Sequence, residues 1–246
     1  VSPCGRLAPE QLVEQVRAAG YDALFVTDHY TPEFFAVHPT GEDYRIYLER
    51  YFSGYRRAAE AGRRAGLRVF PGLEVRLYDG PEDYLVYGVS PEQLAELPCL
   101  AFLSLEELHA AVRSTPDGVL VQAHPYRDYL TCQDARHLDG IEVLNANPRH
   151  DSHNDRALAY AQAHGLLLEL VALGLEGGSV LLVADADSGR VFVALRHALE
   201  EELLDGVALT KLDVGGNVSI AKTARCQVAI DAVGAVQNRA HTQHIG

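Results

Sequence analysis

Three side chains able to bind a divalent cation follow apolar, strand-like runs of the sequence. His29, Glu74 and His124 each stand at or just after the end of such a run, and a fourth run, Gly140–Leu144, ends in a polar loop. Imidazole nitrogen and carboxylate oxygen are ligands that zinc, manganese and iron accept in proteins. In a parallel α/β sheet, the carboxyl ends of the strands carry the functional groups. The strand ends therefore predict a polar site at one end of a barrel.

Each of these residues also has a plainer interpretation. His29 could be a loop histidine that hydrogen-bonds its neighbour, and Glu74 could be a solvated carboxylate at a strand exit. A carboxylate that bridges two cations needs both of its oxygens free. His124 is the most constrained of the three because Pro125 follows it and denies the next position a backbone donor. A histidine held that rigidly is more often functional.

Further polar residues accompany this set. Arg127 lies three residues after His124, where a guanidinium could hold a phosphate oxygen bidentately, although a surface salt bridge fits its position equally well. Asp83 stands at the start of an apolar run rather than at its end, so it is a weaker candidate. Asn147 or Asp151 could simply cap the following helix. The polar loop before that helix also contains Asn145, Arg149, His150, His153 and Asn154.

Strands and helices must alternate to place these residues. Apolar spacing predicts helices over 8–20, 43–65, 105–112 and 154–164. It predicts strands over 21–27, 67–74, 84–89, 119–123 and 140–144. Alternation with short connections is typical of a mostly parallel sheet with helices outside.

The sequence pattern changes after about residue 168. A strand over 180–184, a helix over 191–204 and a strand over 206–210 continue the alternation, but no polar strand ends accompany them. We place a boundary near 168–178, which divides the chain into a domain over 1–168 and a divergent α/β segment over 169–246.

Composition narrows the function classes. The 246 residues carry a formal net charge of -13, which argues against nucleic acid or an anionic membrane as a partner. The four cysteines include no C-x-x-C pair, so neither a zinc ribbon nor a disulfide framework is indicated, and a cytoplasmic location is expected. The longest apolar stretch, 165–184, contains Glu169 and Glu176 and is not expected to span a membrane.

About residues 1–167 resemble the PHP domain (polymerase and histidinol phosphatase) family of metal-dependent phosphoesterases. The similar segments occur in family order and are Ser2–Arg6, Thr27–Tyr30, Gly72–Glu74, Asp83–Gly88, Ala123–Pro125, Asp139–Val143 and Asn147–Asp151 with Asn154. The resemblance implies an α/β fold, a distorted TIM-like (β/α)7 barrel. It also implies that His29, Glu74 and His124 bind divalent metal ions (zinc, manganese or iron), with Glu74 bridging two of them.

Two family motifs have no counterpart in this sequence. An Asp-x-His-x-His-like strand normally precedes the segment that matches Ser2–Arg6, so the barrel is expected to be incomplete at its N-terminal strand. A Ser-Asp-x-His-like motif normally follows the segment that matches His164–Leu166, where Leu167–Val171 stands instead. A catalytically degenerate PHP-like domain that acts as a scaffold or binding module is therefore the alternative function.

The C-terminal third has a fainter resemblance to strands of signal-recognition-particle-type GTPases, over 180–189 and 205–213. In those proteins a Thr-Lys-Leu-Asp segment reads the guanine base, which implies Lys211 and Asp213 here. The sequence contains no intact G-x-x-x-x-G-K-[ST] loop, and the nearest segment, Gly216–Thr223, lacks the second glycine. A nucleotide-binding fragment is accordingly a third hypothesis.

The function predicted first is hydrolysis of a small phosphorylated metabolite or nucleotide by metal-activated water. His29, Glu74 and His124 would bind the metal, and Arg127 would assist the phosphate.

Overall fold

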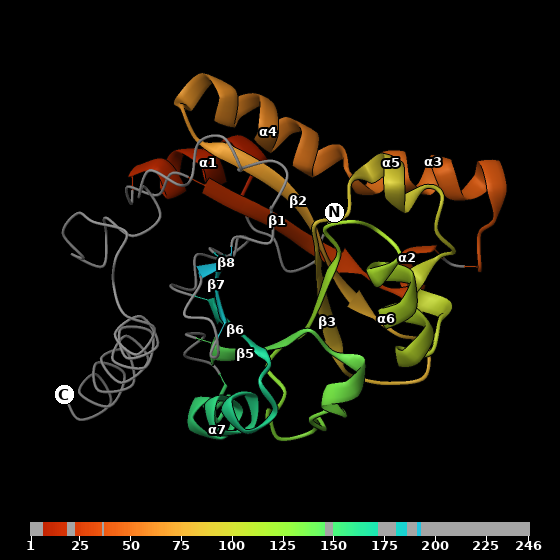
Figure 1. The fold of residues 1–246 in the computed structure, drawn as a ribbon. Coiled ribbons are helices and arrows are strands. Elements are labelled where there is room, and N and C mark those ends of the chain that lie inside the picture. The colour runs from red at the N-terminus through yellow and green to blue at the C-terminus, as the bar shows by residue number, and fades with distance from the viewer. Residues whose placement is uncertain are drawn as a thin grey trace.

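The strands form one curled sheet in which neighbours follow the order of the sequence, from β1 at one edge to β8 at the other (Figure 1). This computed structural model describes residues 7–18, 23–35, 37–145, 150–171, 181–185 and 191–192. Its strands are β1 (Ala23–Tyr30), β2 (Arg68–Arg76), β3 (Asp83–Tyr87), β4 (Val119–Gln122), β5 (Gly140–Asn145), β6 (Leu167–Val171), β7 (Leu181–Asp185) and β8 (Val191–Phe192).

The helices lie outside the sheet (Figure 1). They are α1 (Pro9–Ala18), α2 (Pro32–Phe35), α3 (Gly41–Tyr51), α4 (Ser53–Ala65), α5 (Pro91–Leu94), α6 (Leu105–Arg113) and α7 (Asn154–His164). Left-handed glycines end two of them, Gly66 after α4 (φ 66°) and Gly165 after α7 (φ 64°). The helix predicted over 43–65 is present as α3 and α4, which are separated by one turn residue, Phe52 (φ -78°, ψ 4°). Hydrogen bonds of helical spacing continue through this residue, from Phe52 N–H to the Leu48 carbonyl oxygen and from Arg56 N–H to the Phe52 carbonyl oxygen.

The sheet is mixed, so the prediction of a mostly parallel sheet is wrong for the strands described. Parallel pairs join β1 to β2, β4 to β5 and β5 to β6, whereas β3 runs antiparallel to both β2 and β4. The short connection 77–82 explains this reversal, since parallel neighbours need a long crossover and antiparallel neighbours need only a turn. β7 runs antiparallel to β6 and β8 antiparallel to β7, and β8, Val191–Phe192, lies where the first residues of a helix were predicted.

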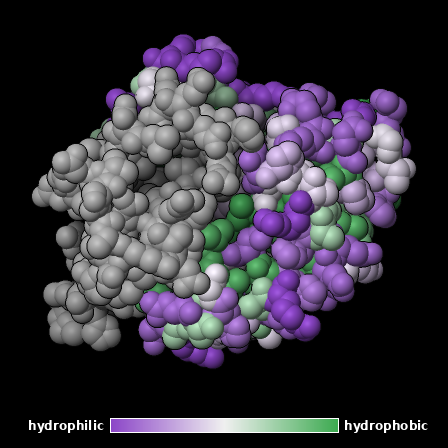
Figure 2. Space-filling model, in the orientation of Figure 1, coloured by the Kyte–Doolittle hydropathy of each residue, from purple (hydrophilic) through white to green (hydrophobic). Residues whose placement is uncertain are grey.

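Neighbouring residues of a strand face opposite sides of the sheet. The outer side contributes to the main hydrophobic core beneath α3, α6 and α7, with Tyr30, Leu73, Tyr84, Val86, Leu120 and Ile141 among its members. The inner side carries a smaller apolar cluster of Phe25, Leu85, Tyr87, Val121 and Ala123. In the orientation of Figure 1, apolar side chains show near the centre of a mostly hydrophilic surface (Figure 2).

Several ionisable residues share the inner side with this apolar cluster. His29, Glu74, Asp83 and Glu142 are each adjacent in sequence to a residue of the main core, and alternation therefore turns them inward. They come from β1, β2, β3 and β5. The curl of the sheet brings strands that are distant in sequence around one polar centre.

A closed TIM-like barrel is not confirmed. β1 and β8 form the edges of the sheet, and no pairing between them is present among the described residues. The division into domains at residue 168 stays a prediction. No helix in the described ranges is long and apolar enough to cross a bilayer.

Candidate metal centre

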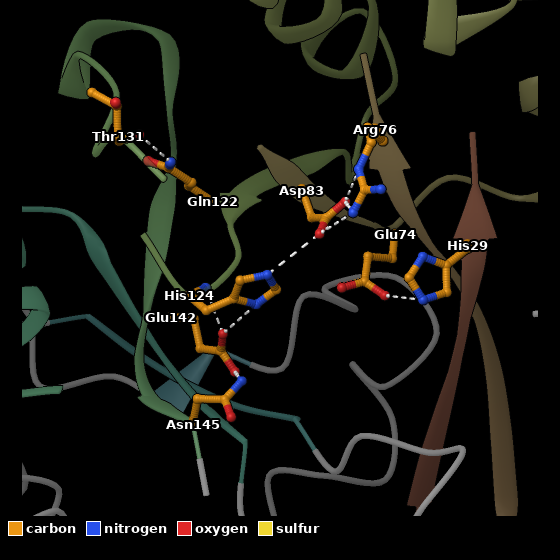
Figure 3. A network of polar contacts seen from close by, with 9 residues as sticks. All are labelled: His29, Glu74, Arg76, Asp83, Gln122, His124, Thr131, Glu142 and Asn145. Atoms are coloured by element: carbon orange, nitrogen blue, oxygen red, sulfur yellow. Dashed lines mark hydrogen bonds and ion pairs between the residues drawn. The ribbon is translucent and has the colours of Figure 1, made fainter. Parts of the chain in front are cut away.

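Glu74, Asp83 and His124 together form a group that could hold a metal ion, each offering one ligand atom, with these atoms all within 4.8 Å of one another. Figure 3 shows their side chains converging from β2, β3 and the residues after β4. The antiparallel direction of β3 causes this meeting, because the first residue of β3 lies beside the ends of β2 and β4. The backbone N–H of Ala123 donates to the Asp83 carbonyl oxygen at 2.9 Å. This hydrogen bond holds the end of β4 beside the start of β3.

Asp83 is held by a guanidinium on the neighbouring strand. Arg76, its register partner on β2, donates from Nε to Oδ1 at 3.0 Å and from Nη2 to Oδ2 at 2.9 Å. Burial by itself would raise the pKa of the Asp83 carboxyl, but the hydrogen bonds from His124 and Arg76 hold it below its usual range. Asp83 is therefore a charged carboxylate in a buried position.

His124 lies between two carboxylates. Its Nε2 is 3.3 Å from Oδ2 of Asp83, and its Nδ1 is 3.4 Å from Oε2 of Glu142. Burial works against the protonated ring, but the hydrogen bonds to Asp83 and Glu142 outweigh it and raise the pKa of His124 to about 9. The backbone of His124 has a φ of 32°, a left-handed conformation that residues with a Cβ rarely adopt.

Glu74 is the carboxylate of this group with the fewest partners. Its described contact is with His29, whose Nε2 lies 3.5 Å from Oε2 of Glu74, because the two residues are register partners on β1 and β2. Burial raises the pKa of Glu74, with His29 opposing this shift. A cation at the centre would remove that electrostatic penalty.

Of the residues predicted to bind metal, the structure brings Glu74 and His124 together and places His29 at their side, where its described ion pair is with Glu74. Asp83 takes the third place in the group. Glu142 is not among the predicted site residues, although it lies in the similar segment Asp139–Val143, and a carboxylate inside the apolar run Gly140–Leu144 is a signal for it.

Arg127 is on the loop that follows His124, and its backbone N–H donates to the His124 carbonyl oxygen at 3.2 Å. Its Nε is buried and has no hydrogen-bond partner in the described part of the chain. The positive charge of Arg127 acts on His124, where it lowers the pKa. An unsatisfied guanidinium nitrogen close to the centre is a suitable donor for an oxyanion.

The described residues of the polar loop before α7 support the centre through hydrogen bonds. Asn145 donates from Nδ2 to Oε1 of Glu142 at 2.9 Å, and its backbone N–H donates to Oδ1 of Asn154 at 3.0 Å. Asp151 accepts the backbone N–H of His153 at 2.9 Å instead of capping α7. Asn147 and Arg149 lie outside the described residues, as do Lys211 and Asp213.

The donor set suits a divalent cation. One imidazole and two carboxylates are ligands found with zinc, iron and manganese, and together the two carboxylates balance the charge of such an ion. The position of Glu74, with an elevated pKa and one described contact, agrees with a ligand whose partner would be a cation.

A solved structure supports the fold. An amidohydrolase from Chromobacterium violaceum, described with bound sulfate and no metal, is similar at a TM-score of 0.50 and 16% identity, covering 80% of this chain and 92% of that one. The described chain thus shares an α/β fold with a known hydrolase.

Two further structures are similar at a TM-score of 0.49. A candidate metal-dependent phosphoesterase from Bifidobacterium adolescentis is 19% identical, over 72% of this chain and 88% of that one. A two-domain protein from Bacteroides vulgatus with a predicted PHP-like metal-dependent phosphoesterase is 16% identical, over 68% of this chain and 47% of that one. No family model matches the sequence, and no curated protein matches it. Nothing in these comparisons supports the GTPase resemblance.

Proposed function

We propose that this protein is a PHP-like, metal-dependent phosphoesterase. The observation that carries the proposal is the convergence of Glu74, Asp83 and His124, whose ligand atoms all lie within 4.8 Å of one another on the inner side of the sheet. In this proposal His29, which is in contact with Glu74, completes the coordination.

Different residues of the chain have different roles in the proposed hydrolysis of a phosphoester. A bound divalent ion supplies activated water and neutralises charge on the phosphoryl oxygens. Glu74, Asp83 and His124 hold that ion, and Arg76 keeps the Asp83 carboxylate charged and oriented. Arg127, with its unsatisfied Nε, binds and orients a phosphate oxygen.

The substrate in this proposal is a small phosphorylated metabolite or nucleotide. A net charge of -13 disfavours a polyanion that must lie along the protein surface. A single phosphate group needs only the local positive charge of the ion and of Arg127. Neither nucleic acid nor a membrane is a partner in this scheme.

A catalytically inactive binding module is the second candidate, and Arg76 is the observation that favours it. Both oxygens of Asp83 accept hydrogen bonds from Arg76, and His124 is paired with Asp83 and Glu142. These two residues of the centre are satisfied without a cation. Metal content and turnover, measured together, separate the two functions.

The first experiment is elemental analysis of the purified protein beside turnover of p-nitrophenyl phosphate with added manganese. We expect bound metal and turnover in the wild type, and loss of both in His124→Ala. His164→Ala is the control, because His164 is an exposed residue at the end of α7. Bound metal without turnover, or no metal at all, would contradict the enzyme function and favour the binding module.

A further inference from the structure

The structure points to Glu142 as a positioning residue that selects which nitrogen of His124 binds the ion. We propose that Glu142 fixes the imidazole in the tautomer with the proton on Nδ1 and leaves Nε2 free as the ligand atom. This inference rests on the proposed metal centre and goes beyond it, because Glu142 itself is not one of the three ligands.

The first observation is the way in which one carboxylate oxygen serves two parts of the same residue. Oε2 of Glu142 accepts the backbone N–H of His124 at 2.6 Å and lies 3.4 Å from Nδ1 of its ring. The backbone bond holds His124 in its left-handed conformation, with a φ of 32°. Main chain and ring are therefore oriented by the same atom.

The second observation is that the two ring nitrogens face different surroundings. Figure 3 shows Nδ1 directed to Glu142 and Nε2 directed to Asp83, on the side where Glu74 also lies. Nε2 is 3.3 Å from Oδ2 of Asp83. Only Nε2 is turned to the other two ligands, so a proton on Nε2 would block the centre, whereas a proton on Nδ1 would not.

The third observation is that Glu142 is itself fixed. Its side chain is 2% exposed, and its second oxygen accepts from Nδ2 of Asn145 at 2.9 Å. Asn145 is held in turn by Asn154, the first residue of α7, which accepts its backbone N–H at 3.0 Å and donates to its carbonyl oxygen at 3.3 Å. A line of hydrogen bonds thus connects the start of α7 to the metal-facing histidine.

Outer carboxylates of this kind orient histidine ligands and raise their basicity, and their loss weakens metal binding by roughly 10–100-fold. A glutamine at position 142 keeps the shape of the side chain but presents only one accepting oxygen. Placed where Oε2 lies, that oxygen can still accept from the backbone N–H and from Nδ1 of His124, but the neutral amide holds the Nδ1 proton less strongly than a carboxylate does. The NH2 group of the glutamine would also face the donating Nδ2 of Asn145.

The test compares wild-type protein with Glu142→Gln, Glu142→Asp and Glu96→Gln. Zinc affinity is measured by competition with a chelator, and the histidine tautomer is measured by two-bond 1H–15N spectra of the zinc-loaded protein. We expect an affinity loss of roughly 10–100-fold in Glu142→Gln, with a changed His124 signature. Glu142→Asp should recover part of both, and Glu96→Gln, at an exposed ion pair with Arg45, should match the wild type.

The outcomes separate this inference from the proposed function. Wild-type protein that binds no zinc overturns the metal centre itself. Zinc binding and a His124 signature that are the same in wild type and Glu142→Gln overturn the positioning role alone. If neither Glu142 variant folds, as judged by circular dichroism, Glu142 serves stability and the positioning role is likewise overturned.

Discussion

Asp83 and His124 meet across 41 positions of sequence, with Oδ2 of Asp83 3.3 Å from Nε2 of His124. One residue begins its strand and the other follows the end of its strand, so the contact exists only because β3 runs against β4. Arg76 completes the arrangement from β2 with two hydrogen bonds to Asp83. The polar centre is thus built around a reversed strand in an α/β fold.

Replacing Asp83 by asparagine should destabilise the metal-free protein. The substitution keeps the size of the side chain but leaves Arg76 and His124 without their shared negative partner. We expect a loss of roughly 1–3 kcal/mol in the free energy of unfolding, below the full cost of breaking a buried pair because Arg76 is 36% exposed. Urea unfolding with a chelator present measures this loss. Glu96→Gln, at an exposed pair, should cost less than about 1 kcal/mol, and equal losses in the two variants would contradict the assigned role of Asp83.

Replacing Glu74 by glutamine should have the opposite effect on stability while removing the metal. Burial raises the pKa of Glu74, so the ionised carboxylate is disfavoured in the folded, metal-free chain. We therefore expect Glu74→Gln to unfold at a urea concentration no lower than the wild type. Elemental analysis should show that metal and phosphatase activity disappear together. A Glu74→Gln protein with full metal occupancy would exclude Glu74 as a ligand.

The sequence predicts part of this centre because strand ends are local features. An apolar run that stops at His29, Glu74 or His124 is visible without knowledge of the sheet, and alternation along each strand then sets the side that the residue faces. Asp83 is a weaker candidate from the sequence because it stands at the start of its apolar run, whereas a mostly parallel sheet carries functional groups at strand ends. The short connection 77–82, which contains Gly80 and Pro81, was the local signal for a reversal.

Other parts of the centre depend on contacts that a sequence does not display. Glu142 faces His124 because β4 and β5 are adjacent in the sheet, and Arg76 binds Asp83 because the two are register partners. Both relationships follow from the pairing of strands, which local propensity does not determine.

Substitution of Arg127 should weaken the binding of phosphate and leave the binding of metal unchanged. In the metal-loaded protein, Arg127→Ala should weaken competitive inhibition by inorganic phosphate by roughly 10–100-fold, the range for losing a charged hydrogen bond. Arg127→Lys should recover part of that loss, since it restores the charge but not the fork of the guanidinium. Metal content should stay at the wild-type level in both variants. Arg136→Ala is the matched control, because Arg136 is exposed and paired with Asp134. Equal phosphate inhibition in Arg127→Ala and wild type would show that Arg127 does not contact the substrate.

Deprotonation of the His124 ring should make the metal-free protein less stable at alkaline pH. Burial lowers the pKa of its ring, but Asp83 and Glu142 outweigh burial and raise the pKa from 6.5 to about 9. Because the folded-state pKa is the higher one, the stabilisation is complete below the unfolded pKa and is lost as the pH rises through the folded pKa. A shift of this size corresponds to at most roughly 3 kcal/mol.

Urea unfolding in the presence of a chelator, at about pH 6 and about pH 9.5, tests this dependence. The wild type should lose stability at the higher pH, and His124→Gln should show a smaller fall, since its side chain does not titrate. His164→Gln should keep the wild-type profile, because His164 is exposed. An equal alkaline loss in His124→Gln and wild type would place its origin in another group. The loss of stability at alkaline pH would then contradict the assigned pairing of His124 with Asp83 and Glu142. The geometry of the metal centre depends on that pairing.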